Sequence, residues 1–126
     1  MQDARVEDLL GKTLVSVEQV GVDKIIFTTT EGEKYKMCHF QDCCESVTIE
    51  DIVGDLADLV GEPILLAEEV TSRENPEDAA AATVEHQDDS FTWTFYKFAT
   101  RKGYVDIRWY GKSNGYYSEE VSFEKC

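Results

Sequence analysis

Apolar and polar residues alternate most clearly in the last third of the chain. In residues 104–110 the apolar positions Val105, Ile107 and Trp109 alternate with more polar ones, as in a strand with one buried face. Glycine-containing turns at 101–103 and 112–115 flank this segment. Residues 91–95 and 117–123 also alternate, so the pattern predicts a three-stranded antiparallel meander.

The first half of the chain shows similar strand signals. Residues 14–20 and 25–30 are rich in β-branched side chains and lie on either side of a Gly21 turn, which predicts a hairpin. Residues 34–39 alternate and predict a third antiparallel strand. Val47 and Ile49 resume the alternation, and residues 64–70 form a further candidate strand.

Two short helices are expected beside these strands. Residues 4–10 place Val6, Leu9 and Leu10 on one face before Gly11, and residues 55–61 begin at a potential Asp55 N-cap and end at Gly61. We therefore expect one α+β domain over residues 1–126, with a largely antiparallel curved sheet of about six to eight strands and one or two short helices. Residues 72–89 are polar and predict a long exposed loop. The expected core residues are Leu14, Val17, Ile25, Phe27, Val47, Ile49, Leu56, Leu59, Leu65, Trp93, Phe95, Ile107, Trp109, Val121 and Phe123.

The chain is strongly acidic. It has 26 Asp and Glu against 12 Lys and Arg, a net charge of −14 on 126 residues. Such a charge repels nucleic acid and anionic membranes, so we expect no direct binding to either. The start of the chain does not resemble a signal peptide, and no apolar run approaches the roughly 18 residues of a membrane span. A protein of the bacterial cytoplasm is the expectation.

Reactive side chains are concentrated in residues 37–46, which contain three of the four cysteines. Thiolate and imidazole are good zinc ligands, but the pairs Cys38–His39 and Cys43–Cys44 are adjacent, and neighbours on an extended chain point in opposite directions. We therefore expect no metal and no cofactor. The favoured interpretation is a structural polar corner in which His39 bonds Asp42, formed by His39, Asp42, Cys43, Cys44 and Glu45.

Nucleophilic catalysis by this segment is disfavoured. Asp42 and Glu45 flank Cys43 and Cys44, and nearby anions raise the pKa of a thiol. Cytoplasmic cysteines are normally reduced, and a disulfide between adjacent cysteines is strained, so free thiols are expected. The chain also has no phosphate-binding glycine loop, no nucleophile elbow and no zinc-protease motif. We expect a protein that is not an enzyme.

Two further sets of residues are candidates for binding. Arg108 and Tyr110 share the strand face opposite Ile107 and Trp109, and the following turn adds small polar and aromatic side chains suited to a polar ligand or a partner. An ordinary polar outer face is the alternative. The second set consists of acidic pairs whose adjacent members face opposite ways on a strand, which favours solvated surface over paired catalytic carboxylates. Together the binding candidates are Arg108, Tyr110, Ser113, Asn114, Tyr116, Ser118, Glu68, Glu69, Asp88 and Asp89.

Two motifs resemble an uncharacterised family of small proteins carried by phages and prophages. The first is His-x-Gln-Asp-Cys-Cys-Glu-Ser at residues 39–46, and the second is Arg-Trp-Tyr-Gly-x-Ser-Asn-Gly-Tyr-Tyr-Ser at residues 108–118. The resemblance extends over most of residues 9–123 apart from the loop. Where that pattern often has Tyr before the His, this chain has Cys38. The resemblance implies phage genomic context, and small phage accessory proteins often disarm host defences.

Three functions are compatible with these observations. The favoured hypothesis is a non-enzymatic, anti-defence inhibitor of the phage type, whose acidic surface occupies the basic nucleic-acid channel of a host defence complex. The second is a small-ligand binder, such as a sponge for a nucleotide signal, using residues 39–45 and 108–118. This hypothesis is supported by the charge of residues 91–126, where 6 basic and 4 acidic residues give +2. The third is a metal-dependent hydrolase.

Overall fold

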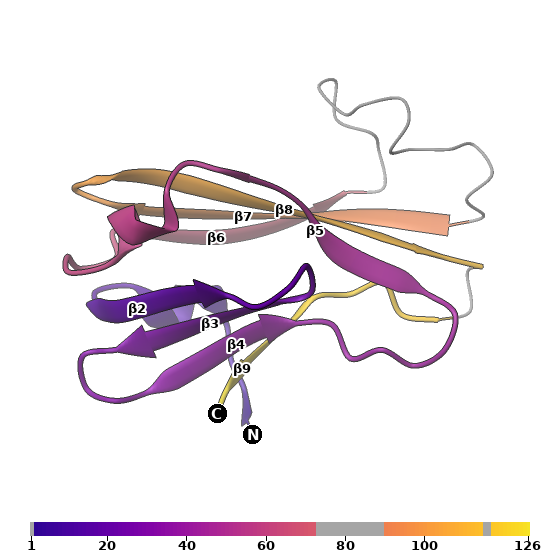
Figure 1. The fold of residues 1–126 in the computed structure, drawn as a ribbon, viewed down its shortest axis with the longest axis horizontal. Coiled ribbons are helices and arrows are strands. Elements are labelled where there is room, and N and C mark those ends of the chain that lie inside the picture. Colours follow the sequence, from indigo (N-terminus) through magenta and orange to yellow (C-terminus); the bar gives the residue numbers. More distant parts are fainter. Residues whose placement is uncertain (1, 73–89, 115–116) are drawn as a thin grey trace.

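The computed structural model describes residues 2–72, 90–114 and 117–126. In this part of the chain, nine strands form two sheets that lie one above the other (Figure 1). Two short 3-10 helices lie between strands in the sequence. The elements are β1 (Gln2–Asp3), η1 (Val6–Leu9), β2 (Leu14–Gln19), β3 (Lys24–Thr29), β4 (Lys34–Cys38), β5 (Ser46–Val53), η2 (Leu56–Leu59), β6 (Leu66–Ser72), β7 (Ser90–Thr100), β8 (Gly103–Ser113) and β9 (Ser122–Lys125).

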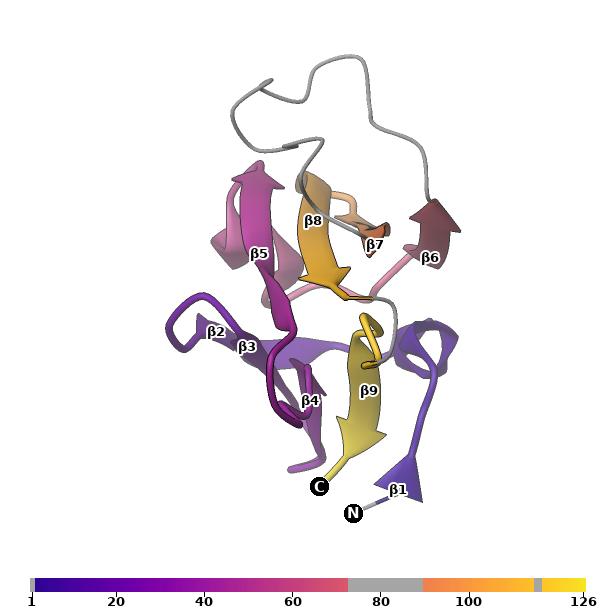
Figure 2. The same ribbon diagram turned by 90° about the vertical axis from the view of Figure 1, so that its right-hand side faces the viewer.

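One sheet has five strands in the order β1-β9-β4-β3-β2, and the other has four in the order β5-β8-β7-β6. All paired strands are antiparallel. β9 lies between β1 and β4, so the end of the described chain completes the sheet that the first hairpins began (Figure 2). The architecture is therefore a two-layer β-sandwich.

The long β7–β8 hairpin is the centre of the four-stranded sheet. Each of its strands has 11 residues, and they pair from Ser90↔Ser113 to Thr100↔Gly103. β5 adds to β8 with an irregular register between Ile49 and Asp51. A β-bulge of this kind places one extra residue on the strand and re-aims its side chain.

The core lies between the two sheets. Phe27 of the five-stranded sheet contacts Phe98 of the four-stranded sheet, with ring centroids 5.5 Å apart. Trp109 and Ile107 from β8 are fully buried in the same cluster, together with Leu9 of η1. Burial of each such large apolar side chain contributes about 1.5–3 kcal/mol, so this layer supplies most of the stability.

The expected α+β class is wrong, because the described residues are almost entirely strand, in two separate sheets. The two expected helices are 3-10 helices of four residues each. Asp55 is the N-cap of η2, as expected, and its side chain accepts a hydrogen bond from the Ala57 amide. Four residues form only one tight helical turn. The apolar residues that predicted α-helices, such as Leu9 and Leu59, are buried in the core from these single turns.

Several core predictions also need correction. Leu65 is exposed, and Phe95 is half-buried outside the central cluster. Trp93 is fully buried, but it too lies outside that cluster. Tyr96 and Phe98 are the aromatic residues of β7 that face the core. Ser72 belongs to β6, and the remainder of the expected loop, residues 73–89, lies outside the described residues.

Candidate functional site

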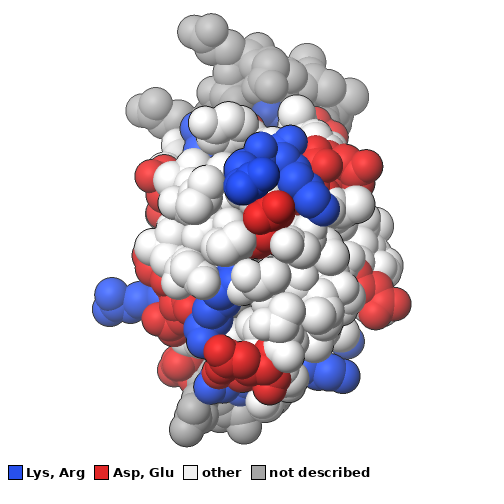
Figure 3. All heavy atoms as spheres, turned by 90° about the vertical axis from the view of Figure 1, so that its left-hand side faces the viewer, with Lys and Arg blue, Asp and Glu red and all other residues white. Residues whose placement is uncertain are grey.

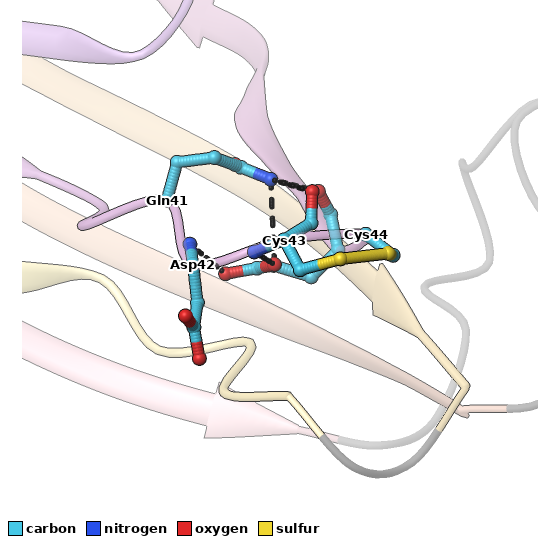
Figure 4. Close-up of a disulfide and its surroundings, with 5 residues drawn as sticks. Gln41, Asp42, Cys43 and Cys44 are labelled. Atoms are coloured by element: carbon cyan, nitrogen blue, oxygen red, sulfur yellow. Dashed lines mark hydrogen bonds between the residues drawn. A yellow bond between two sulfur atoms is a disulfide. The ribbon is translucent and has the colours of Figure 1, made fainter.

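Residues 39–45 connect β4 to β5 and are organised around the carboxylate of Glu45. That carboxylate accepts hydrogen bonds from the backbone amides of Asp42 (2.8 Å) and Cys43 (2.9 Å). The Gln41 side chain donates to the Glu45 carbonyl oxygen at 2.6 Å (Figure 4). The side chain of Glu45 is completely inaccessible to solvent. These bonds fold the segment into a tight turn around a buried anion.

His39 connects this turn to the segment that precedes β9. Its Nε2 lies 2.8 Å from a Glu45 carboxylate oxygen, and its Nδ1 lies 2.7 Å from the carbonyl oxygen of Glu120. A carboxylate oxygen and a carbonyl oxygen both accept hydrogen bonds, so each of these bonds forms when the ring nitrogen that faces it carries a proton. The two contacts of His39 therefore join two segments that are far apart in the sequence.

The expected His39–Asp42 pair differs from the structure, in which Glu45 is the partner of His39. Burial raises the pKa of Glu45, but the Cys43 and Asp42 amides and His39 together outweigh it and lower the pKa to about 2. The Asp42 side chain is exposed and points away from the turn (Figure 4). Because the ionised Glu45 is fully engaged in these bonds, it is poorly suited to act as a general base, and the corner serves the fold.

The sulfur chemistry of the segment also differs from expectation. Cys43 and Cys44 are joined by a disulfide and are both exposed (Figure 4), whereas free thiols were expected. The thiols of Cys38 and Cys126 are free, and Cys38 is buried. Burial raises the pKa of the Cys38 thiol, which disfavours the thiolate form needed for nucleophilic attack.

A second buried carboxylate lies near the end of β8. Glu119 accepts hydrogen bonds from Thr92 Oγ1 (2.7 Å) and from Ser113 Oγ. Ser113, a predicted binding residue, therefore holds the segment that follows β8 against β7 and β8. The sequence does not distinguish Glu119 from the adjacent, exposed Glu120.

Arg108 and Tyr110 lie on the outer face of the four-stranded sheet, as predicted. Arg108 forms a two-point ion pair with Glu50, the residue inserted by the irregularity in β5. Its guanidinium also lies 5.4 Å from the centre of the Trp93 ring, and Trp93 packs on Tyr110 at 4.6 Å. Alternation in the sequence predicts the shared face, but neither the Glu50 partner nor the packing on Trp93.

A hollow of about 120 Å³ opens beside this cluster. Its walls come from β5, β7 and β8, and they combine apolar and charged side chains. The residues that line it include Asp51, Val53, Phe95, Lys97, Asp106 and Arg108. Sequence reasoning did not identify Val53, Phe95 or Lys97 as site residues.

The other predicted binding residues, as far as the structure describes them, are dispersed. Asn114 and Ser118 are exposed, and Ser118 Oγ accepts a hydrogen bond from the Glu120 amide. Glu68 and Glu69 are exposed on β6, where Glu68 pairs with Lys97 and Glu69 with Tyr96 across the ladder. The remaining predicted residues, Tyr116, Asp88 and Asp89, lie outside the described residues. Among the members of this set that the structure describes, Arg108 and Tyr110 lie together, but the described members do not all form one site.

Within residues 2–72, 90–114 and 117–126, no three or more His, Cys, Asp or Glu side chains are grouped so that they could hold a metal ion. No helix in the described ranges is long and apolar enough to cross a membrane.

Comparison with protein families gives a match over residues 7–123 to a domain of unknown function, DUF7448. The chain belongs to the DUF7448 family. The range that matches this family includes the Glu45 corner, the Arg108 cluster and the hollow beside it. The expected membership of an uncharacterised family is confirmed at this level. No curated protein and no solved structure matches this DUF7448 chain.

Proposed function

We propose that the protein is a non-enzymatic binding protein whose acidic surface engages a basic surface of a nucleic-acid-processing complex. The observation that carries this proposal is the net charge of −14 on 126 residues. Figure 3 shows acidic side chains in several separate groups on one face of the molecule, with Lys and Arg beside some of them. An acidic protein attracts a basic partner over long distances and speeds the encounter.

The state of the reactive groups supports binding over catalysis. The His39–Glu45 pair is buried and committed to the fold, and burial disfavours the Cys38 thiolate. The resemblance of the two motifs to phage and prophage proteins suggests the setting. In that setting the protein inhibits a host defence complex in the bacterial cytoplasm, by covering the channel that receives nucleic acid.

A small-ligand binder is the second candidate, and one observation favours it. A hollow of about 320 Å³ lies beside η1, β6 and β9, and ligand pockets usually measure about 300–1,000 Å³. Arg5 lines this hollow, but so do Glu7 and Glu69, whose carboxylates repel phosphate. A nucleotide signal is therefore a weaker proposal than a basic protein.

The proposed function can be tested in bacteria that carry a DNA-targeting defence system. Production of the protein should restore plaque formation by a phage that the system normally blocks. The association rate with the purified defence complex should fall steeply as the Debye length shortens from about 10 Å at 0.1 M salt to about 3 Å at 1 M. Failure to restore plaques across a panel of such systems, with association rates indifferent to salt, would refute the proposal.

A further inference from the structure

The outer face of the four-stranded sheet carries apolar side chains that the core does not use. Val53 and Val70 are 60% and 52% exposed, and Tyr104 is 74% exposed. In the strand register Val70 pairs with Phe95, which pairs with Arg108, and Val53 pairs with Asp106. All of them therefore lie on the sheet face opposite the core. Apolar and aromatic groups with an arginine among them are typical of protein interfaces.

The hollow on this face has the size of one side chain. Its volume of about 120 Å³ is well below the roughly 300–1,000 Å³ of small-molecule pockets, and close to the roughly 150 Å³ cavity that holds one benzene. Val53 and Phe95 give it apolar walls. The hollow therefore suits a single aliphatic or aromatic side chain presented by a partner.

The charges around the hollow indicate the character of that partner. Asp51 and Asp106 line it, and Lys97 lies across the ladder from both Asp106 and Glu68. Arg108 is paired with Glu50, and counting Glu50 and Glu68 with the lining residues gives four acidic and two basic side chains, so the surroundings of the hollow are acidic on balance. A second copy of the chain also has a net charge of −14 and would be repelled, whereas a basic segment would be attracted.

We propose that this face docks a basic protein segment that inserts one apolar side chain between Val53 and Phe95 and places Lys or Arg against Asp51 and Asp106. The inference rests on the proposed function, because it takes the partner to be basic. It identifies which face of the molecule binds and what the partner must present. Buried apolar anchors of this kind usually contribute most of the binding energy of an interface.

The test uses two short synthetic peptides with the same Lys and Arg residues. One carries a central Trp–Leu pair and the other a central Ser–Ser pair, and fluorescence anisotropy measures the affinity of the full chain for each. We expect the Trp–Leu peptide to bind about tenfold more tightly, since one filled apolar pocket is worth at least that factor. Amide chemical shifts should change in β5, β7 and β8 and not in β2 and β3.

Matched variants separate the docking face from general electrostatics. Val53→Lys with Val70→Lys should weaken binding of the Trp–Leu peptide by about tenfold or more. Val22→Lys with Val15→Lys adds the same charge at valines that are 58% and 52% exposed, and should weaken it by less than about threefold. Val53→Ser with Val70→Ser repeats the test without added charge, and thermal melts verify that each variant is folded.

Other outcomes would contradict one or both proposals. If both peptides bind equally and both lysine pairs weaken them equally, the docking face is refuted and charge-driven binding stands. If binding requires Val53 and Val70 but is indifferent to salt, the apolar anchor stands, whereas the contacts of Lys or Arg with Asp51 and Asp106 and the proposed function both fail. No binding of either peptide at low salt refutes both. A dimer in sedimentation that Val53→Lys dissociates identifies a second copy as the occupant and overturns the inference.

Discussion

Replacement of Gly111 by alanine should destabilise the protein, whereas the same replacement at Gly103 should not. A Cβ atom on Gly111 would lie 2.9 Å from the carbonyl oxygen of Glu119 and 3.2 Å from Val47 Cγ2. At Gly103 the nearest atom is the carboxylate oxygen of Asp58, at 3.0 Å. The first contact involves backbone, and the second involves the end of a side chain that can rotate away.

The magnitudes follow from two opposing terms. Overpacking typically costs about 1–3 kcal/mol, and alanine in place of glycine returns about 0.5–1 kcal/mol by restricting the unfolded chain. At Gly111 the neighbouring backbone is held by the Glu119 carboxylate, which Thr92 and Ser113 bind, so overpacking wins by about 1–2 kcal/mol. At Gly103 the carboxylate of Asp58 can move away from the new methyl group. The lower entropy of the unfolded chain then stabilises the variant by about 0.5 kcal/mol.

Urea unfolding of the two variants and the parent protein gives the free energies directly. The Gly111→Ala midpoint should fall and the Gly103→Ala midpoint should rise or stay constant. Faster hydrogen exchange at the Glu120 amide in Gly111→Ala would locate the disturbance in the segment over β8. If Gly111→Ala unfolds at the same urea concentration as the parent, the close approach of that segment is refuted.

Three further predictions concern the two polar clusters. The stability that ionised Glu45 contributes should be complete above pH 4.5 and should disappear as the pH falls toward 2, because its pKa is lowered from 4.5 to about 2 in the folded state. The difference in melting temperature between the parent protein and Glu45→Gln should therefore narrow over that pH range. Asp42→Asn should leave the melting temperature unchanged, because only the backbone amide of Asp42 binds Glu45, and a clear loss would show that its carboxylate matters. Arg108→Ala should cost about 1–2 kcal/mol in urea unfolding by leaving Glu50 unpaired and uncovering Trp93, and Arg108→Lys should recover little because lysine lacks the planar fork.

Most strands were predictable, but the third strand of the expected meander, residues 117–123, was predicted wrongly, because β9 (Ser122–Lys125) pairs with β4 in the other sheet. The number of layers was not predictable either. The strands expected at residues 14–20, 25–30 and 34–39 are confirmed to within one residue at each end, as β2 (Leu14–Gln19), β3 (Lys24–Thr29) and β4 (Lys34–Cys38). Short-range patterns do not state which strands pair, however, and β9 joins β4 across most of the sequence. The division into two sheets depends on such long-range pairing.

The orientation of β7 was predicted wrongly for a physical reason. Its residues are apolar or aromatic on both faces, with Trp93 and Phe95 outside and Tyr96 and Phe98 inside. Residues 91–95 alternate, but the apolar residues change face at Tyr96, so the alternation does not identify which face packs against the core. For the same reason the hollow beside Arg108 was not predicted, because Phe95, which lines it, was expected in the core.

The Glu45 corner shows the limit of local reasoning about charge pairs. Asp42 and Glu45 both lie near His39 in the sequence, and nothing in their spacing favours either as its partner. The choice follows from the backbone of the turn, which directs the amides of Asp42 and Cys43 at Glu45. Such an anion-binding turn is apparent only when the dihedral angles are known.

The position of β9 has a consequence for how the chain acquires its structure. Tyr35 of β4 pairs with Lys125, 90 positions later, so one side of β4 stays unpaired until that distant segment arrives. During synthesis, β2, β3 and β4 can pair before β9 is made, and until then the edge of β4 is open and apolar residues of these strands are uncovered. Contacts of such long sequence separation fold slowly, and unpaired edges invite association between chains. A fusion or label placed after β9 can therefore affect the protein by delaying the pairing of β9 with β4, even where it lies far from the docking face.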